Sequence, residues 1–544
     1  MTALEAPHAG VHAAAVLQGH GIDTVFTLNG GHLWPLYDGC VQRGIDLVDT
    51  RHEQTAAFAA EGWAKITRRA GCAMLTAGPG VTNGVSALTA AHLNGSPVLV
   101  LAGRAPALRW GSGSLQELDH IPLVAPVCRY ADTAWGAEEV VTKTDAALRA
   151  ARSPHRGPAF VDIGLDGFGG GSVEMPTIDE DALRGPAPDR ADVARVAQLV
   201  DSAARPVVVA GGDVHFAAAE DALAAWIEMT EVPVYVNGMG RGTVPADHPF
   251  AFSRTRSRAL KDADLVVVVG TRLDFRLGFG RFGSAPVVHL VDAPGELGRH
   301  AAPAAATTGD LRATLEMLLS EPVSGAARAA HRAWVGELRT AEHAARVADD
   351  AALMIPDDPI KPMRVYGELV RHLDRDAIVI GDGGDFVSYA GKYIDSFTPG
   401  SFLDPGPFGC LGMGPGYALA ASRAAPGRQM VLLLGDGAAG FALGDWDTLV
   451  RHAVDVTIVI GNNGIWGLEK HPMQALFGYD VVSDLRPGTR YDEAMVALGG
   501  GGELVEHPTE LGDALDRAFA HAGPYVVNVL TDPADAYPRS SNLG

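Results

Sequence analysis

The stretch Gly435–Asn463 decides the fold expected for this chain: it begins Gly-Asp-Gly, ends Asn-Asn and has 24 residues in between. Apolar runs lead into both ends, Met430–Leu434 into the first and Val456–Ile460 into the second. Two such strands joined by a helix-length connection form a parallel βαβ unit with a right-handed crossover. We therefore expect Asp436 and Asn463 to meet at the carboxyl edge of a sheet, where ligands of open α/β sheets bind.

These residues have the chemistry of a metal site. A carboxylate from Asp436, an amide oxygen from Asn463 and a loop carbonyl at Ile465 are hard oxygen ligands. They suit a Mg²⁺ ion that keeps water and takes its other ligands from a diphosphate. A strand-end turn and an Asn-rich turn without any ligand are the plainer alternative. Small residues around Asp436 let backbone N–H groups approach that diphosphate closely; they are Gly435, Gly437 and Ala438.

At this spacing the two elements resemble the signature of thiamine-diphosphate enzymes. A second resemblance lies far upstream, where Arg51–Ala57 reads R-H-E-Q-T-A-A. In those enzymes, a segment of this form carries the glutamate that hydrogen-bonds the aminopyrimidine ring of the cofactor. The resemblance implies that Glu53 binds thiamine diphosphate and helps to activate its thiazolium ring, whose chemistry belongs to the cofactor. A helix-capping or ion-paired structural acid is the alternative for Glu53.

A third segment, Gly409–Gly416, resembles the family element that supports the bent cofactor with a large apolar side chain under its two rings. Leu411 falls on that position, and Met413 is the second choice. A glycine-rich loop leading into a packed alanine-rich helix is the alternative for this segment.

The 544 residues are too many for one hydrophobic core and predict about three domains. Strand-like apolar runs alternate with helical stretches throughout, which predicts an α/β fold with parallel sheets. The resemblance implies three doubly wound parallel-sheet domains: pyrimidine-binding, middle Rossmann-like and diphosphate-binding. With a C-terminal lid segment added, the expected boundaries are 1–185, 190–345, 360–530 and 531–544.

Composition narrows the classes of function. The formal net charge of −22 argues against general nucleic-acid binding and against attraction to an anionic membrane surface. The four cysteines are widely spaced without a metal-ligand pattern, which predicts reduced thiols in a cytoplasmic protein. Residues 1–10 show no secretory signal, and no apolar run reaches transmembrane length.

The organisation resembles the acetolactate synthase-like group of thiamine-diphosphate enzymes across essentially the whole chain. In that group, the catalytic glutamate and the metal-binding residues meet across a subunit interface. The resemblance therefore implies a homodimer or homotetramer with active sites between subunits, and it leaves the choice between the two open.

Two sets of motifs favour different members of the group. Asn29–Asp38 is similar to a segment of acetolactate synthases, and Gln116-Glu117 matches part of their F-Q-E-x-D element. Oxalyl-CoA decarboxylases and 2-hydroxyacyl-CoA lyases instead have segments similar to Gly435–Phe441 and Arg490–Met495. The C-terminal tail of the lyases is also similar to Arg539–Leu543. Because this second set flanks the reaction chamber, we expect the lyases and decarboxylases to be the closer relatives.

We therefore predict a lyase that cleaves a 2-hydroxyacyl-CoA thioester, such as 2-hydroxyisobutyryl-CoA, to a ketone or aldehyde plus formyl-CoA, reversibly as an acyloin condensation. Glu493 is the candidate base for the C2-hydroxyl proton, and Gln116 is the candidate to orient the same oxygen. A solvent-facing position on a surface helix is the alternative for Glu493. An acetolactate synthase-type carboligase or decarboxylase of 2-oxoacids is the alternative activity, and the C2 substituents and the physiological direction stay open.

The middle block resembles the domain that holds ADP in the CoA-handling members and FAD in acetolactate synthases. Asp292 would accept from a ribose hydroxyl, while Arg156 and Arg272 would face the adenosine or its phosphates. We expect ADP with the lyase activity and FAD with the synthase activity, and an empty domain is the remaining alternative. The basic run Arg254–Lys261 is either a solvated helix face or an entrance for anionic CoA.

Overall fold

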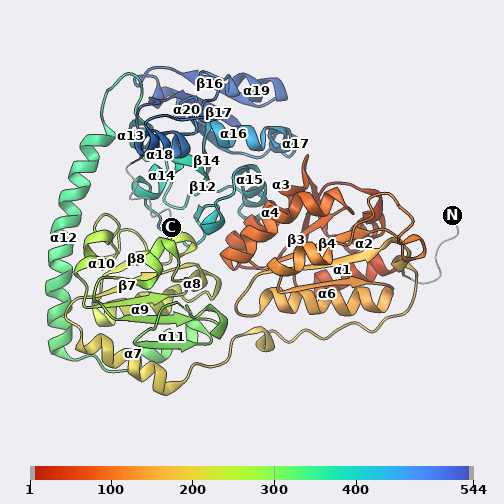
Figure 1. Ribbon diagram of the computed structural model, residues 1–544, viewed down its shortest axis with the longest axis horizontal. Helices are drawn as coiled ribbons and strands as arrows, with labels where there is room; N and C mark the ends of the chain where they lie inside the picture. The colour runs from red at the N-terminus through yellow and green to blue at the C-terminus, as the bar shows by residue number, and fades with distance from the viewer. Residues whose placement is uncertain (1–6, 299, 538–544) are drawn as a thin grey trace.

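Three α/β domains, each built on one parallel sheet, make up the molecule (Figure 1). The structure is a computed structural model that describes residues 7–298 and 300–537. Every strand pairing within the three sheets is parallel, and helices connect the strands. The predicted fold class is confirmed.

The first domain surrounds a six-stranded sheet. Its strands are β1 (Thr24–Thr27), β2 (Asp46–Asp49), β3 (Gly71–Leu75), β4 (Val98–Arg104), β5 (Tyr130–Ala134) and β6 (Pro158–Gly164). Its helices are α1 (Ala9–Gly19), α2 (Trp34–Arg43), α3 (Glu53–Thr67), α4 (Pro79–Asn94), α5 (Ile121–Val124) and α6 (Ala137–Arg152). The strand order is β2-β1-β3-β4-β6-β5, and the central strands are buried along their whole length, as expected for a sheet covered on both faces.

The middle domain has a five-stranded sheet. Its strands are β7 (Pro206–Ala210), β8 (Val234–Val236), β9 (Leu265–Val269), β10 (Val287–Val291) and β11 (Ala305–Thr308), in the order β11-β10-β9-β7-β8. Its helices are α7 (Arg190–Ser202), α8 (Gly212–Phe216), α9 (Glu220–Thr230), α10 (Arg256–Asp262) and α11 (Leu311–Leu318). The 29-residue helix α12 (Gly325–Leu353) then runs along one side of the molecule to the third domain (Figure 1).

The third domain repeats the topology of the first. Its strands are β12 (Ile378–Asp382), β13 (Phe402–Leu403), β14 (Met430–Gly435), β15 (Thr457–Asn462), β16 (Gly501–Val505) and β17 (Tyr525–Leu530). Its helices are α13 (Pro362–Leu369), α14 (Gly384–Tyr393), α15 (Gly414–Ala424), α16 (Asp436–Phe441), α17 (Trp446–Arg451), α18 (Gly467–Phe477), α19 (Tyr491–Leu498) and α20 (Leu511–Ala520). The order β13-β12-β14-β15-β17-β16 matches that of the first sheet strand for strand.

The first and third domains pack together through α3 and α15, whose buried residues belong to one apolar cluster. Glycine permits the close approach of the two helices. A Cβ atom on Gly416 would lie 2.7 Å from the carbonyl oxygen of Thr55, and one on Gly62 would lie 3.0 Å from Cα of Tyr417. The helix that begins with Glu53 is therefore held against the third domain of the same chain.

Two other expectations concern the chain ends and the surface. Of the lid segment expected at 531–544, residues 538–544 lie outside the described part of the chain. The basic run Arg254–Lys261 overlaps α10, and Arg254 pairs with Asp349 at 2.9 Å, so part of its charge is neutralised within the fold. Within residues 7–298 and 300–537, no helix combines the length and the apolar character needed to cross a membrane.

Candidate functional site

The predicted metal-binding residues lie on two adjacent loops of the third domain. Strands β14 and β15 pair in parallel up to Gly435 and Gly461, so the residues that follow them emerge at the same carboxyl edge. Asp436, which is 3% exposed, accepts a hydrogen bond from the backbone N–H of Gly464 at 2.9 Å. Asn463 Oδ1 accepts from the N–H of Ile465 at 3.2 Å. The structure thus brings the two loops into direct contact.

The environment of Asp436 fits a cation. Burial raises the pKa of its carboxyl group to about 6, although backbone N–H groups of the neighbouring loops act in the opposite direction. These hydrogen bonds do not fully compensate for the burial of the carboxylate. A positive ion in the site would therefore stabilise its charged form. The hydroxyl group of Tyr491 donates to the carbonyl oxygen of Asp436 at 2.9 Å and holds this turn in place. The donor set of carboxylate and amide oxygens therefore fits Mg²⁺.

A cavity of about 470 Å³ opens beside Asp436 and Asn463, large enough for a small organic ligand. Its wall includes Phe275 of the middle domain and Trp466, whose ring lies 2.4 Å from the position of a Cβ atom on Gly437. The packing of Trp466 therefore requires glycine at position 437. Most of the predicted cofactor contacts of the third domain line this cavity: Leu411, Gly435, Gly437, Ala438 and Asn463.

Leu411 and Met413 differ in what they contact. Leu411 is half-buried and lines the cavity, where its Cδ2 atom lies 2.2 Å from the position of a Cβ atom on Gly383. Met413 is fully buried in the core shared by the first and third domains. Of the two, only Leu411 can reach a ligand in the cavity.

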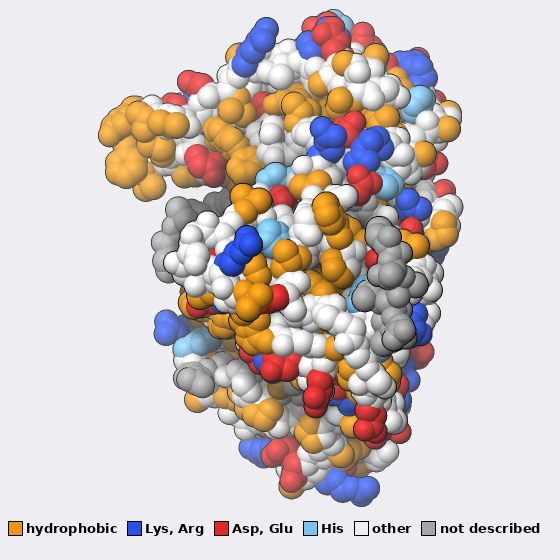
Figure 2. All heavy atoms as spheres, turned by 90° about the vertical axis from the view of Figure 1, so that its right-hand side faces the viewer, with side chains coloured by type: hydrophobic (Ala, Val, Ile, Leu, Met, Phe, Trp, Pro, Cys, Tyr) orange, Lys and Arg blue, Asp and Glu red, His pale blue; other side chains and the backbone are white. Residues whose placement is uncertain are grey.

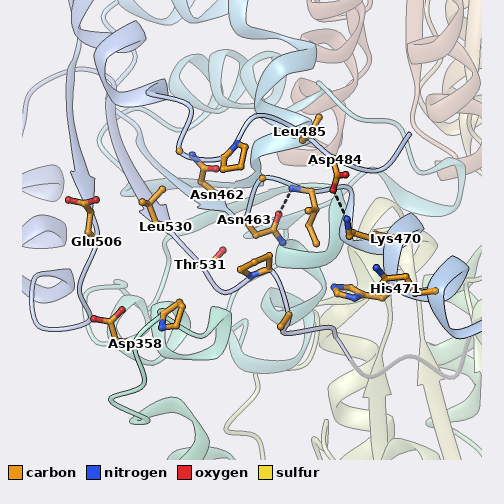
Figure 3. Close-up of a pocket in the computed structure, with 18 of the residues that line it drawn as sticks. Asp358, Asn462, Asn463, Lys470, His471, Asp484, Leu485, Glu506, Leu530 and Thr531 are labelled. Atoms are coloured by element: carbon orange, nitrogen blue, oxygen red, sulfur yellow. Dashed lines mark hydrogen bonds and ion pairs between the residues drawn. The ribbon is translucent and has the colours of Figure 1, made fainter. Parts of the chain in front are cut away.

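The same Asn463 loop also borders a second, larger cavity of about 1030 Å³ (Figure 3). Asn463 and Ile465 line both cavities, so this loop forms the wall between them. In Figure 3, Lys470 points to Asp484, with which it forms an ion pair. The larger cavity is therefore a neighbour of the Asp436 site with a polar lining of its own.

Glu53 occupies the first position of α3 in the first domain and is 8% exposed. Its Oε2 atom accepts a hydrogen bond from the side-chain amide of Asn83 on α4 at 2.9 Å. The preceding residue, His52, caps the helix by accepting from the N–H of Gln54. Glu53 is therefore not the helix cap, and it forms no ion pair within the described residues. Neither structural alternative, a capping acid or an ion-paired acid, fits it.

The turn before Glu53 is tied to the third domain by Asp445. This carboxylate accepts from the backbone N–H of Arg51 at 2.8 Å and from the hydroxyl group of Thr55 at 2.6 Å. It is 2% exposed. A carboxylate far away in the sequence therefore sets the position of Glu53.

Other polar residues near Glu53 had no assigned role in the sequence analysis. His32 follows β1, Thr76 follows β3, and Nδ1 of His32 lies 3.4 Å from Oγ1 of Thr76. A Cβ atom on Gly80 would lie 2.8 Å from Thr76 and 3.6 Å from Glu53, so these groups share one edge of the first sheet. The signals in the sequence were the position of Thr76 directly after a buried strand and that of His32 within the segment Asn29–Asp38.

Gln116 lies at the same edge, in the loop that follows β4. It is half-buried with a φ of +60°, and its Cβ atom is 3.0 Å from the position of a Cβ on Gly78. Its neighbour Glu117 accepts from the N–H groups of Gly111 and Ser114, at 2.9 and 3.2 Å, and so stabilises its own loop.

The structure does not bring Glu493 to the cavity of Asp436 within one chain, and its position fits the solvent-facing alternative. Its side chain is 66% exposed and pairs with Arg490 at 2.9 Å on the surface of α19. The residue before it, Asp492, is buried and accepts from the side-chain amide of Asn528 at 2.9 Å. With Tyr491 bound to the carbonyl of Asp436, the segment supports the metal-binding turn and leaves Glu493 facing solvent.

Within one chain the structure does not join the two halves of the predicted site. Glu53 is absent from the residues that line the 470 Å³ cavity containing Asp436 and Asn463.

The predicted nucleotide-binding residues of the middle domain fall into two groups. Arg156 and Asp292 line a cavity of about 460 Å³ between the first and middle domains, together with Arg68, Arg152 and Arg312. Arg272 is paired with Glu296 at 2.6 Å and lines a separate cavity of about 40 Å³. Both carboxylate oxygens of Asp292 face Nδ1 of His155, at 3.1 and 3.3 Å, so its partner here is an imidazole where a ribose hydroxyl was expected.

Comparison with known proteins matches the chain to three family models. They are the N-terminal TPP binding domain of thiamine pyrophosphate enzymes over residues 8–123, the central domain over 193–318 and the C-terminal TPP binding domain over 382–529. A probable acetolactate synthase of Mycobacterium bovis and an acetolactate synthase large subunit of Mycobacterium tuberculosis are each 56% identical over 547 residues, covering 98% of both chains. The 2-hydroxyacyl-CoA lyase 2 of Homo sapiens is 33% identical over 577 residues, covering 97% of this chain and 90% of its own.

These comparisons overturn the predicted lyase activity. Relatives named acetolactate synthases share 56% of the sequence over nearly its full length, whereas those named lyases share 31–34%. The motifs that favoured the lyase were misweighted, because Arg490–Met495 supports the turn at Asp436 and does not line the cavity. The acyl-CoA substrate and the formyl-CoA product belonged to that activity and are abandoned with it.

Proposed function

The chain belongs to the thiamine pyrophosphate enzymes, and we propose that it is a carboligase of 2-oxoacids of the acetolactate synthase type. In such a reaction, one 2-oxoacid loses carbon dioxide and its acyl carbon joins the carbonyl carbon of a second 2-oxoacid. Two molecules of pyruvate give acetolactate and carbon dioxide. The identity of 56% over 98% of both chains with relatives named acetolactate synthases carries this proposal.

When bound, thiamine diphosphate supplies the carbon nucleophile and the electron sink of the reaction. The carboxylate of Asp436 and the side-chain oxygen of Asn463 would hold a Mg²⁺ ion against its diphosphate, with the loop at Ile465 as a further ligand. Leu411 would support the rings, because it is a half-buried apolar side chain on the cavity wall at the position that the family resemblance indicates. Backbone N–H groups at Gly437 and Ala438 would face the diphosphate.

Glu53 would hold and move a proton at the aminopyrimidine ring. Two observations support this role: the side chain is buried, and one of its oxygens is fixed by Asn83 while the other is 3.6 Å from the position of a Cβ on Gly80. Asp445 would act as a positioning residue, since it holds the backbone on both sides of Glu53.

The polar groups beside Glu53 suit a 2-oxoacid, whose carboxylate and carbonyl oxygens accept hydrogen bonds. Burial lowers the pKa of His32, and His120 lowers it further, so the imidazole is neutral near pH 7 and donates one hydrogen bond. The side-chain amide of Gln116 is a second donor at the same edge. We propose that His32 and Gln116 orient the substrate.

The site would be completed by a second copy of the chain. Glu53 does not line the cavity of Asp436, which supports a site in which the two halves come from different subunits of a homodimer or homotetramer. Figure 2 shows hydrophobic side chains gathered on one face, including a knob that projects to one side. Large apolar side chains are exposed on both domains that would meet there: Trp34, Leu108, Leu115, Phe441, Leu476 and Val482.

We also propose that the middle domain binds an adenine nucleotide in the 460 Å³ cavity, whose size falls in the range of small-molecule sites. Arg152, Arg156 and Arg312 would face the phosphates there. Release of a nucleotide on denaturation, identified by its absorption spectrum, tests this.

The decisive experiment is product analysis with purified protein, thiamine diphosphate and Mg²⁺. Pyruvate alone should give acetolactate and an equal amount of carbon dioxide. A panel of 2-hydroxyacyl-CoA thioesters should give no formyl-CoA above the background of boiled enzyme. Absence of acetolactate from pyruvate and from pairs of 2-oxoacids would defeat the proposal.

A further inference from the structure

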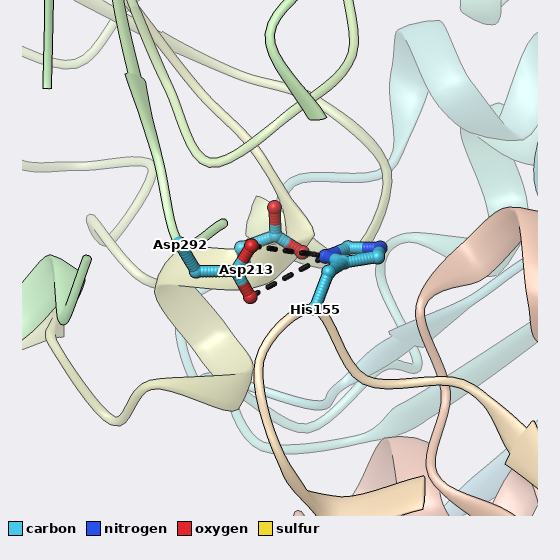
Figure 4. A group of neighbouring side chains, drawn as sticks. All are labelled: His155, Asp213 and Asp292. Carbon is cyan, nitrogen blue, oxygen red and sulfur yellow. Dashed lines mark hydrogen bonds and ion pairs between the residues drawn. The ribbon is translucent and has the colours of Figure 1, made fainter. Parts of the chain in front are cut away.

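A cluster of charged side chains lies where the first domain meets the middle domain, away from the thiamine diphosphate site. His155 follows α6 in the first domain, whereas Asp213 of α8 and Asp292 after β10 belong to the middle domain. Figure 4 shows the imidazole of His155 directed at the two carboxylates. All three residues are buried, with 6%, 7% and 3% of their surfaces exposed.

The ligand atoms of this cluster lie close enough together for one metal ion to bind all three side chains after small movements. Nδ1 of His155 lies 3.1 Å from Oδ1 of Asp292 and 3.7 Å from Oδ1 of Asp213, and the second distance is too long for a hydrogen bond. Metal–ligand bonds of about 2.1 Å, at angles of about 90–110°, separate neighbouring ligand atoms by about 3.0–3.4 Å. The first distance falls within that range, the second is slightly longer, and the three ligand atoms lie within 4.8 Å of one another.

A second, independent observation is the other nitrogen of His155. Nε2 is buried and has no hydrogen-bond partner, and Oε2 of Glu296 lies 3.9 Å from it. Imidazoles that bind metal usually direct their other nitrogen to a carboxylate, which fixes the tautomer and the ring orientation. Glu296 is itself held by Arg272 at 2.6 Å and stands where such a partner is needed.

The remaining coordination positions have room for water. The cavity of about 40 Å³ beside the cluster is lined by His155, Asp213 and Asn237. One water needs about 10–15 Å³ of such space, so the cavity holds more than one. The side-chain nitrogen of Asn237 is buried there without a partner and can donate to such a water.

Charge also favours a cation at this position. Burial raises the pKa of Asp213 to about 7, and the nearby carboxylate of Asp292 adds to the rise, so existing partners do not fully neutralise this group. Burial lowers the pKa of His155, but the surrounding carboxylates outweigh it and raise the pKa to about 9.

We propose that His155, Asp213 and Asp292 bind one divalent transition-metal ion, such as Zn²⁺, that ties the first domain to the middle domain. One imidazole and two carboxylates form a donor set that Zn²⁺ accepts at a tetrahedral site with one water. The site is separate from the Mg²⁺ expected at Asp436, because its three ligands come from the first and middle domains, whereas Asp436 belongs to the third.

The test counts metal on the full chain. Protein stripped with a chelator is dialysed at pH 8 against Zn²⁺ without thiamine diphosphate, and bound zinc is measured by mass spectrometry. About one Zn²⁺ per chain should stay on the wild type and on Asp436→Asn, and should be lost from Asp213→Asn and His155→Gln. His248→Ala is the matched control, since that imidazole also faces a carboxylate, Glu228 at 3.2 Å, near the surface.

Thermal unfolding gives a second readout that does not depend on activity. Zn²⁺ should raise the melting temperature of the wild type and of His248→Ala, and should leave the two cluster variants unchanged. Wild-type crystals soaked in Zn²⁺ should show an anomalous scattering peak between His155 and the two carboxylates. Absence of that peak, or equal amounts of bound zinc on the wild type and the cluster variants, would overturn the proposal. The cluster would then be only a buried ion pair between His155 and the two carboxylates.

Discussion

At the scale of single residues, Asp436 and Glu53 are both buried acids with different surroundings. Asp436 is enclosed by backbone N–H groups at the edge of the third sheet, where burial raises its pKa to about 6. Glu53 accepts one hydrogen bond, from the side-chain amide of Asn83. The first arrangement is suited to a metal ion and the second to a group that exchanges protons with a ligand.

The raised pKa of Asp436 predicts a conflict between stability and cofactor binding. Because the pKa is raised in the folded state, from 3.8 to about 6, its contribution to stability is present below about pH 4 and is lost as the pH rises through 6. Without metal, Asp436→Asn should therefore be at least as stable as the wild type at pH 7, by a difference on the order of 2 kcal/mol or less. The same variant should not retain thiamine diphosphate with Mg²⁺.

Urea unfolding of both proteins at pH 4.5 and pH 7, with calorimetry for the cofactor, measures the two effects. If Asp436→Asn bound the cofactor as tightly as the wild type, Asp436 would not be a metal ligand.

Glu53→Gln keeps the shape of the side chain and its hydrogen bond from Asn83 but cannot exchange a proton as a carboxyl group does. We expect the turnover rate to fall by roughly 10²–10⁴-fold, with folding unaffected. Glu493→Ala is the control, because that exposed side chain pairs only with Arg490 among the interactions described for this chain. Steady-state rates with pyruvate compare the two variants, and the assignment of Glu53 fails if both retain wild-type turnover.

At the scale of elements, the start of α3 is fixed by the third domain. Asp445 accepts hydrogen bonds from the N–H of Arg51 and the hydroxyl of Thr55, and both donors would be left unsatisfied without it. We expect Asp445→Ala to cost about 1–3 kcal/mol in the free energy of unfolding and to lower turnover. Asp447→Ala, which removes an ion pair to Arg451 near the surface, should cost less than about 1 kcal/mol.

Denaturant unfolding and turnover of the two aspartate variants provide the comparison. A fall in turnover for Asp445→Ala without any loss of cofactor affinity would support a positioning role for Asp445. Equal effects of the two substitutions on stability and turnover would contradict it.

The contact between α3 and α15 depends on glycine. A Cβ atom on Gly416 would lie 2.7 Å from the carbonyl of Thr55 and 3.0 Å from the backbone nitrogen of Ala59, so the helices must separate to accept it. Gly416→Ala should therefore cost about 1–3 kcal/mol in stability. Gly336→Ala, at an exposed position inside helix α12 with open space around it, controls for a general effect of replacing a helical glycine. Melting temperatures that fall equally in both variants would contradict this packing argument.

At the scale of the whole molecule, each chain carries one Glu53 and one Asp436 that do not share a cavity. If the site forms between subunits, a mixed dimer of Glu53→Gln and Asp436→Asn chains has one site with both native residues. Random mixing of equal amounts makes half of the dimers mixed, so about a quarter of the wild-type activity should return.

Unfolding and refolding the two inactive variants together, then assaying with pyruvate, measures this recovery. Each variant refolded alone serves as the control. Complete inactivity of the refolded mixture would show that Glu53 and Asp436 act within the same subunit.

The sequence by itself determined the fold class and the parallel βαβ unit at Gly435–Asn463, and it predicted which residues would carry the cofactor chemistry. These depend on local signals, namely apolar runs of strand length followed by polar residues at fixed spacing. Asp436 and Asn463, which line the 470 Å³ cavity, were predicted for this reason, whereas Phe275 and Trp466 on its wall were not.

Only the tertiary structure decided the roles of residues whose partners lie far away in the chain. It placed Glu493 on the surface, joined Asp445 to the start of α3 and assembled His155, Asp213 and Asp292 from two domains. Burial and long-range contacts depend on how domains pack, and sequence periodicity does not encode that packing. The activity was misjudged for the same reason, because a motif near the site in sequence, Arg490–Met495, supports its backbone and does not face the ligand.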